Sequence, residues 1–399
     1  MAQLFGAILL WLGGHSAASF YAPVHRVKQW AWATYWISLG FVAWIIMPTI
    51  GGLLVTNDLF QVLSESPMQA KLLAYLFGVL WGFGGLMAAL ALRYLGLGLG
   101  NSIALGICAI VGTLVPAFMD NKLGDLASTQ PGQVISLGLF VCLIGIVFCG
   151  WAGYLKEQTM TKTADDSPNN EFAFGKGLIV GIGGGIMSAF MAISLAAGAP
   201  IAKVSLAHGT QEVFANIPIL VFSLAGGFTT NFIYTMILNI RDKRMGDWLL
   251  ADKGLLLCNL FWAVVSGLMW YGQYFFYGMG TTQMGDYEFA SWSIFMASIV
   301  ICANLWGIAL KEWKQATAKT KVVLWIGILI LIASICLVGW GNYLTPAKAN
   351  APTEKPAPAA VEKAADKPAL ATPAKADTPA EAAADTAAPA AEKATPAAK

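Results

Sequence analysis

The sequence predicts an all-α membrane protein with ten transmembrane helices, arranged as two inverted five-helix repeats and followed by a disordered tail rich in Ala, Pro and Lys. Hydrophobic residues make up 57% of the 399 residues and charged residues only 12%, whereas about a quarter of a soluble domain is charged. The net charge of only +2 gives no reason to expect nucleic-acid binding. The natural partner of such a chain is a lipid bilayer.

Ten apolar runs account for the spans, and each is close to the roughly 20 residues that cross a bilayer as a helix. They cover residues 3–23, 32–54, 71–92, 95–118, 132–154, 174–198, 213–239, 253–279, 288–310 and 321–343. The first run resembles a signal peptide, but no basic residue precedes it and Arg26 and Lys28 follow it. We therefore expect it to be retained.

The distribution of Lys and Arg predicts the orientation. Fourteen of them lie in or beside the connections that follow odd-numbered spans, and three lie in the other connections. The positive-inside rule places the richer connections in the cytoplasm, so both termini are expected to be periplasmic in a bacterial inner membrane.

A polar linker at residues 156–173 divides the chain into a first repeat at residues 1–155 and a second at residues 174–343. Each half holds five spans, and because five is odd the second half would be inverted. Inverted repeats are typical of transporters, whose substrate sites lie near mid-membrane at the repeat interface. Residues 344–399, which hold nine of the 17 prolines, lack the apolar side chains needed to form a core and are predicted to be a disordered extracytoplasmic tail.

The eighth span carries a polar and aromatic stripe. Trp270, Gln273, Tyr274 and Tyr277 follow the spacing i, i+3, i+4, i+7 and share one helix face. Such a face must contact protein or a water-filled cavity, which indicates a solute site. Aromatic rings with an amide suit a neutral polyhydroxylated ligand. Hydrogen bonding between helices for Gln273, and an aromatic belt at the membrane surface for the tyrosines, are the open alternatives.

Two titratable residues are candidates for proton coupling: His15 within the first span and Glu288 at the start of the ninth. Ionisable groups inside a membrane are functional candidates by default. A neutral hydrogen-bonded histidine and a solvated helix cap are the alternative interpretations.

Enzyme chemistry is not indicated. The six cysteines form no CxxC pair, so no metal site is expected, and the one adjacent acid pair lies in the linker. We expect no catalytic residue and no cofactor other than a proton as coupling ion.

The segment Gly267-Leu-Met-Trp-Tyr-Gly-Gln-Tyr-Phe-Phe-Tyr277 closely resembles the eighth-span signature of the L-rhamnose–proton symporter family, in the drug/metabolite transporter superfamily. Further matching segments are Ser16–Pro23, Lys28–Trp32, Leu92–Gly96, Ile110–Leu114 and Leu310–Trp313. The resemblance covers residues 1 to about 343. It implies ten spans, both termini outside, and uptake of a sugar with protons.

The resemblance also bears on the site. Asn231, Trp270, Gln273 and Glu288 fit the family pattern, and Trp292 lies one turn after Glu288 on the same face. We therefore take Asn231 and Trp292 as further sugar-binding candidates. The chain departs from the pattern late in the sixth span, where Ala196 and Ala199 replace an Asn and a Lys, and at several positions in the first half.

The expected function is proton-coupled import of a small neutral sugar, L-rhamnose or another 6-deoxyhexose. The alternative is a drug/metabolite-type carrier or an exporter of a different small metabolite. The sequence does not indicate an oligomeric state.

Overall fold

The computed structural model describes residues 2–95, 97–161 and 174–345, and every regular element within them is helical. Ten helical segments there are long and apolar enough to cross a membrane. This confirms the ten predicted spans. The linker beyond residue 161 and the tail from residue 346 lie outside the described residues.

The first five spans are built from the following helices, with two short helices in the connections: α1 (Ala2–Ser19), η1 (Ala22–Arg26), α2 (Trp32–Phe41), η2 (Val42–Ile46), α3 (Met47–Val55), α4 (Leu59–Glu65), α5 (Met68–Leu95), α6 (Leu97–Met119), α7 (Leu123–Ser128) and α8 (Gln130–Thr161). The second five are built from α9 (Phe174–Ala197), α10 (Ala199–Ala207), η3 (Glu212–Phe214), α11 (Ile219–Arg241), η4 (Met245–Leu249), α12 (Lys253–Thr281), η5 (Gly285–Ala290), α13 (Ser291–Ala309) and α14 (Ala318–Leu344).

The second span is interrupted by one π-helical turn, η2, between α2 and α3. Pro48 stands in the first turn of α3 and has no N–H to donate to the carbonyl of Trp44, four residues earlier. Because proline removes that α-helical bond, the wider turn accommodates it. The sixth span is interrupted similarly between α9 and α10, where Gly198 and Pro200 stand.

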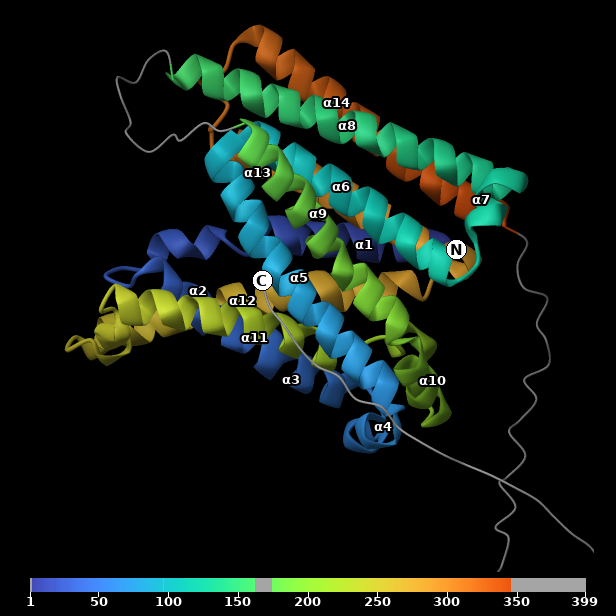
Figure 1. Ribbon diagram of the computed structural model, residues 1–399, viewed down its shortest axis with the longest axis horizontal. Coiled ribbons are helices and arrows are strands. Elements are labelled where there is room, and N and C mark those ends of the chain that lie inside the picture. Colours follow the sequence, from blue (N-terminus) through green and yellow to red (C-terminus); the bar gives the residue numbers. More distant parts are fainter. Residues whose placement is uncertain (1, 96, 162–173, 346–399) are drawn as a thin grey trace, which may run out of the picture. The chain divides into compact units, whose positions relative to one another are not determined.

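The two halves interleave. α5 packs along α9 and α11, while α12 packs along α1 and α2, and α8 runs beside α14 (Figure 1). The third span contacts the sixth, and the first span contacts the eighth. These two contacts are equivalent if spans one to five correspond to spans six to ten. Two related repeats would produce this arrangement, and the inverted repeat itself stays a prediction.

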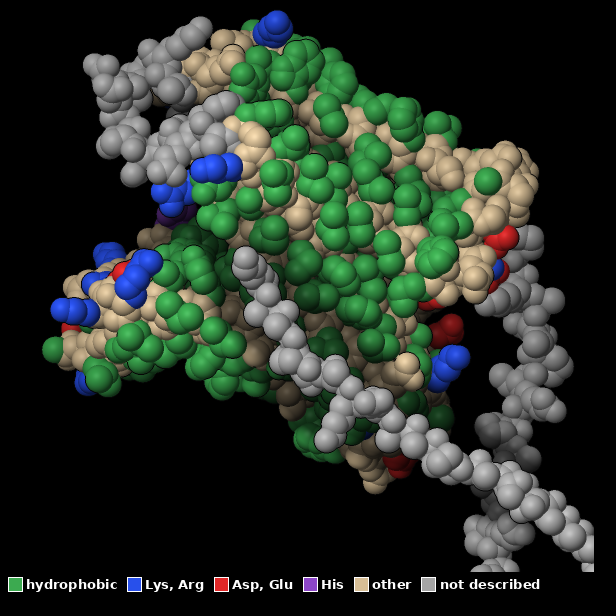
Figure 2. Space-filling model, in the orientation of Figure 1, with side chains coloured by type: hydrophobic (Ala, Val, Ile, Leu, Met, Phe, Trp, Pro, Cys, Tyr) green, Lys and Arg blue, Asp and Glu red, His purple; other side chains and the backbone are tan. Residues whose placement is uncertain are grey.

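The two ends of the helical bundle differ in charge. We call the end where α1 joins α2 and where α11 joins α12 the basic end, because Lys28, Arg241, Lys243 and Arg244 lie there. Figure 2 shows most of the visible Lys and Arg side chains at this end, on the left, and hydrophobic side chains over the surface between the ends. The apolar surface is the one a bilayer would cover.

A buried carboxylate ties the connections together at the basic end. The backbone N–H of Ala31 donates to Asp247 Oδ2 (2.7 Å), and the Thr34 hydroxyl donates to the same oxygen (2.9 Å). Arg244 Nε lies 3.3 Å from Asp247 Oδ1, and the Trp30 indole N–H donates to the Asp247 carbonyl (2.7 Å). We call this group, Asp247 with its four partners, the Asp247 latch; it joins the start of α2 to η4.

At the opposite end a histidine joins α10 to α4. His208 Nε2 lies 2.9 Å from Glu65 Oε2, and Nδ1 lies 3.6 Å from Asp58 Oδ2. The hydrogen bond with Glu65 raises the pKa of His208, and partial burial opposes the shift. The contact is therefore strongest when the imidazole is protonated.

This contact predicts a pH dependence of stability. Because the folded pKa of His208 is raised, its stabilisation is complete below the unfolded value of about 6.5 and is lost as the pH rises through the folded value. The midpoint of thermal unfolding of the purified protein should fall as the pH rises above about 6.5. The His208→Gln variant should show a smaller decrease of the midpoint with pH. The control is His25→Gln in η1, which is exposed at the other end and should leave the slope unchanged.

Candidate solute cavity

The stripe predicted on the eighth span faces the protein interior. Trp270, Gln273, Tyr274 and Tyr277 on α12 are only 4–7% exposed. The aromatic-belt alternative is therefore wrong for Tyr274 and Tyr277, because neither ring lies at the surface. The helical period of 3.6 residues was sufficient to predict which face of α12 is buried.

Most of the stripe belongs to a run of aromatic rings. Trp270 lies 5.2 Å from Trp44 and 5.4 Å from Tyr274, centroid to centroid. Trp36 extends the run from Trp44 (5.9 Å), and Phe295 connects Tyr274 (6.0 Å) to Tyr277 (5.0 Å). We call these six residues the aromatic column: Trp36, Trp44, Trp270, Tyr274, Phe295 and Tyr277. The column runs from the α2 start toward the α12 end and fills the space between them.

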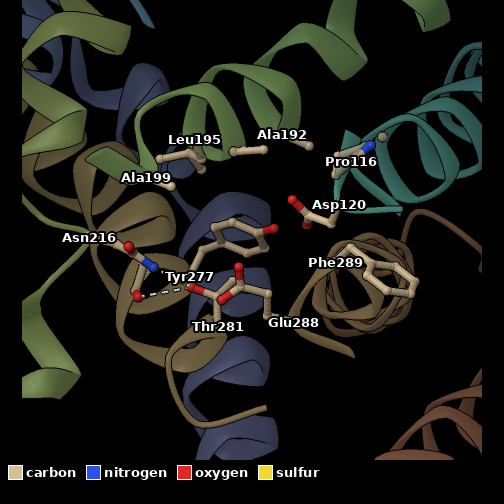
Figure 3. A pocket seen from close by; sticks show the side chains of 13 residues that line it. Pro116, Asp120, Ala192, Leu195, Ala199, Asn216, Tyr277, Thr281, Glu288 and Phe289 are labelled. Carbon is tan, nitrogen blue, oxygen red and sulfur yellow. Dashed lines mark hydrogen bonds between the residues drawn. The ribbon is translucent and has the colours of Figure 1, made fainter. Parts of the chain in front are cut away.

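A cavity lies beside Tyr277, the last member of the aromatic column along α12, and Figure 3 shows the side chains that line it. Tyr277 is the member of the predicted stripe that lines it, together with residues from α6, α9, α10, the η3–α11 connection and η5: Gly112, Pro116, Asp120, Ala192, Leu195, Ala196, Ala199, Asn216, Gly278, Thr281, Glu288 and Phe289. Its volume is about 60 Å³, below the ~300–1,000 Å³ of small-molecule sites. A ligand the size of a sugar would require the lining helices to separate.

The cavity has one apolar wall and one polar wall. Ala192, Leu195, Ala196 and Ala199 form the apolar wall from α9 and α10. On the polar side, the Asn216 side-chain amide donates to the Thr281 hydroxyl (3.0 Å). This arrangement can hold a molecule with both hydroxyl groups and a hydrocarbon face.

Two carboxylates point into the cavity, Glu288 from η5 and Asp120 from the end of α6 (Figure 3). Both side chains are solvent-exposed. Desolvation by the surrounding wall raises the pKa of Asp120, and the charge of Lys122 opposes that shift. Asp120 therefore holds a proton more readily than an ordinary aspartate.

The other predicted residues lie outside the cavity lining. The Asn231 amide oxygen accepts from the Trp36 indole N–H (3.0 Å). Trp292 donates to the Cys108 carbonyl (3.1 Å), and its ring packs against Tyr277 (5.4 Å). The Gln273 side chain donates to the Trp270 carbonyl (2.9 Å). These groups shape the column and its surroundings.

His15, the second residue predicted to couple protons, lies outside the cavity. Its side chain is exposed on α1 and stacks on Trp306 of α13 at 6.1 Å, and it is not among the cavity-lining residues. The structure does not bring His15 together with Glu288.

Sequence reasoning missed Asp120, Asn216 and Thr281. Thr281 follows Tyr277 by four residues, so one more turn of the same helix face would have included it. Asp120 and Asn216 carried no local signal, because each is a polar residue beside the end of an apolar run.

No group of three or more His, Cys, Asp or Glu that could hold a metal ion occurs among the residues that the structure describes. The six cysteines there are unpaired, and four of them are buried.

Comparison with known proteins covers almost all of the helical part of the chain. Residues 1–343 match the family model described as L-rhamnose-proton symport protein (RhaT). The L-rhamnose-proton symporter of Yersinia pestis (strain Pestoides F) is 36% identical over 344 residues, covering 85% of this chain and 98% of the relative. The L-rhamnose-proton symporter of Yersinia pseudotuberculosis serotype O:3 (strain YPIII) has the same identity and coverage. The family match ends where α14 ends.

Proposed function

Since the chain belongs to the L-rhamnose-proton symport protein family, we propose that it imports L-rhamnose, or another 6-deoxyhexose, together with protons. It does so across a bacterial inner membrane, with both termini in the periplasm and the basic end in the cytoplasm. The cavity then opens to the periplasm, and a proton carried on Glu288 enters with the sugar.

The observation that carries this proposal is the convergence of three kinds of group in one cavity. Glu288 supplies a carboxylate, Asn216 and Thr281 supply donors and acceptors, and Tyr277 supplies a ring. Sugar hydroxyls need paired polar partners, and the C–H face of a sugar stacks on aromatic rings. The apolar α9–α10 wall suits the methyl group that distinguishes a 6-deoxyhexose from a hexose.

The aromatic column supports a site that extends inward when the helices separate. The Trp44 indole N–H is buried and has no hydrogen-bond partner in the described part of the chain. Leaving such a donor unpaired costs about 1–3 kcal/mol, and a sugar hydroxyl beside Trp270 would satisfy it. Trp270, Gln273 and Tyr274 are the residues we assign to that deeper position.

Labelled L-rhamnose uptake tests the proposal. Energised cells expressing the chain should accumulate the sugar and alkalinise a weakly buffered medium, and an uncoupler should abolish accumulation. Glu288→Gln should lose accumulation but retain exchange of internal for external sugar, because exchange needs no net proton movement. Asp286→Asn is the control, since Asp286 lies in the same short helix and is not a lining residue. Absence of both accumulation and alkalinisation with every deoxyhexose offered would refute the proposal.

A second candidate is transport of a different small metabolite, in either direction. The observation favouring it is that Ala196 and Ala199, which replace polar residues of the family pattern, line the cavity itself. A panel of competing sugars and metabolites, with flux measured in both directions in vesicles, separates the two candidates.

A further inference from the structure

A second cavity lies between the second, seventh and eighth spans. Its lining comes from α2 and the first residue of η2, from α11 and η4, and from α12. In Figure 1 these helices run together, and α2 packs on both α11 and α12. The cavity has a volume of about 420 Å³, within the ~300–1,000 Å³ of small-molecule sites. It shares no lining residue with the solute cavity.

This cavity is open toward the surface that a bilayer would cover. Its floor is buried, at Val42 and Ala263 among others. Its rim is exposed, since Phe41 is 49% exposed, Phe232 42% and Val264 41%. We call it the lateral groove, with Val42 and Ala263 on its floor and Phe41, Phe232 and Val264 on its rim. A groove of this kind is accessible to the hydrocarbon of the membrane.

The polar side chains of the lateral groove already have partners. The Trp248 indole N–H donates to the Ser38 hydroxyl (2.9 Å), and that hydroxyl donates to the Thr34 carbonyl (2.7 Å). Every other lining side chain is apolar. A sugar in this groove would leave its hydroxyls unpaired, whereas a hydrocarbon chain has no polar group to desolvate. The lateral groove therefore fits an acyl chain.

A cation stands above the groove at the basic end. Lys253 begins α12, and the spacing i, i+7, i+11 places it on the same helix face as Leu260 and Val264, which both line the groove. At 1.5 Å per residue, Lys253 lies roughly 10 Å closer to the end of the bundle than Leu260. The headgroup layer is roughly 5–8 Å thick on each side of the hydrocarbon. With Leu260 in the hydrocarbon, the Lys253 ammonium group therefore lies among lipid phosphates.

The positive charge of Lys253 has no ion-pair partner among the residues that the structure describes. Its ammonium group donates to the Leu250 carbonyl (3.3 Å), and the carboxylate of the neighbouring Asp252 accepts a backbone N–H as the cap of α12 (3.1 Å). Lys243, exposed in the turn after α11, also lacks an ion-pair partner in that part of the chain. The two arginines beside it are paired with aspartates. Unpaired cations beside an apolar groove match an amphiphile with a negative headgroup.

We propose that the lateral groove binds one anionic phospholipid from the leaflet at the basic end. An acyl chain lies over Val42 and Ala263, and the phosphate lies at Lys253. A zwitterionic lipid with the same chains carries its own cation beside the phosphate, so it gains less from Lys253. The inference goes beyond the proposed function, because it does not depend on which solute the protein carries.

The lateral groove also borders the aromatic column. Phe228 lines the groove and lies 6.4 Å from Trp44, centroid to centroid. An acyl chain in the groove contacts α2, α11 and α12 together, so it stabilises the arrangement in which these helices enclose the column. Binding of the lipid should therefore be measurable as an increase in the stability of the folded protein.

The test uses the purified full chain in a non-ionic detergent, with dioleoyl phosphatidylglycerol as the anionic probe and dioleoyl phosphatidylcholine as the zwitterionic one. Phosphatidylglycerol should raise the midpoint of thermal unfolding at a lower concentration than phosphatidylcholine does. Lys253→Gln should raise the phosphatidylglycerol concentration required roughly fivefold, the usual effect of one cation beside an anionic lipid, and leave the response to phosphatidylcholine unchanged. Val264→Trp fills the groove and should reduce the response to both lipids.

Lys319→Gln is the matched control, since Lys319 is an exposed lysine in the first turn of another span, α14, and should leave both responses unchanged. Inorganic phosphate alone should not raise the midpoint; an effect equal to that of phosphatidylglycerol would mean an anion site without an acyl chain.

Equal responses of the unaltered protein to the two lipids would overturn the proposal, and so would equal effects of Lys253→Gln and Lys319→Gln. An unchanged response of Val264→Trp would overturn the position of the acyl chain. None of these measurements involves L-rhamnose, so a negative result leaves the proposed function standing.

Discussion

Asp247→Ala should destabilise the protein by roughly 3–5 kcal/mol, the usual cost of removing one partner from a buried charged group. Asp247 is 7% exposed, and the Ala31 N–H and the fully buried Thr34 hydroxyl both donate to it. Alanine has no acceptor side chain, so the Ala31 N–H loses its partner and Arg244 loses its counter-charge. The Thr34 hydroxyl keeps one acceptor, Asn239 Oδ1 at 3.1 Å. Chemical denaturation of the protein in detergent, followed by tryptophan fluorescence, measures the loss.

Two variants make this prediction specific. Asp242→Ala removes an aspartate from the same connection, but Asp242 is exposed and pairs with Arg241 at the surface. Because that pair is exposed to solvent, its loss should cost far less than the loss of Asp247. Asp247→Asn keeps one acceptor oxygen and the side-chain shape, so its cost should fall between the other two. Equal stability of Asp247→Ala and Asp242→Ala would show that the latch contributes nothing to the fold.

Gly78→Val should destabilise the bundle by about 3 kcal/mol, at the upper end of the usual cost of overpacking, and lower the yield of folded protein. α5 and α11 cross with backbone against backbone. A methyl group on Gly78 would collide with the carbonyl oxygen of Ser223, and one on Gly226 with that of Tyr75. Backbone atoms cannot rotate away as a side chain can, so the helices would have to separate. Close approach through small residues is a common means of helix association in membranes.

Gly85→Val is the matched control on the same helix. Nothing lies within 4 Å of a methyl group placed on Gly85, so this change carries the same gain in helix propensity without the collision. The difference between the two variants in thermal stability and in the monodisperse fraction after solubilisation isolates the cost of the crossing. Equal stability of the Gly78→Val and Gly85→Val proteins would mean that the backbones of α5 and α11 are farther apart than in this structure.

The sequence was sufficient for the spans because each is a long apolar run whose length matches the bilayer. It did not predict α4 and α7, which are short helices in polar connections, or the π turn before Pro48. That turn depends on one missing N–H, whereas hydropathy averages over about twenty residues. Local backbone chemistry of this kind is invisible to a long window.

The site was predictable only where its residues share a helix. The helical period along α12 predicted that Trp270 and Tyr277 lie on its buried face. Extending the same period by one turn would have included Thr281. Asp120 and Glu288 are separated by more than 160 residues, and nothing in either neighbourhood points to the other. Their meeting depends on how α6 packs relative to η5, a tertiary fact that a single sequence does not contain.

The aromatic column has a thermodynamic consequence for an alternating-access cycle. The rings between Trp36 and Tyr277 pack on one another, so a state open toward the basic end would expose them to water. Hydration of newly exposed apolar surface raises the heat capacity. The free-energy difference between the two access states therefore depends on temperature in a curved manner, because the enthalpy difference itself changes as the protein is warmed. We therefore expect temperature to shift the balance between the two access states of the empty carrier.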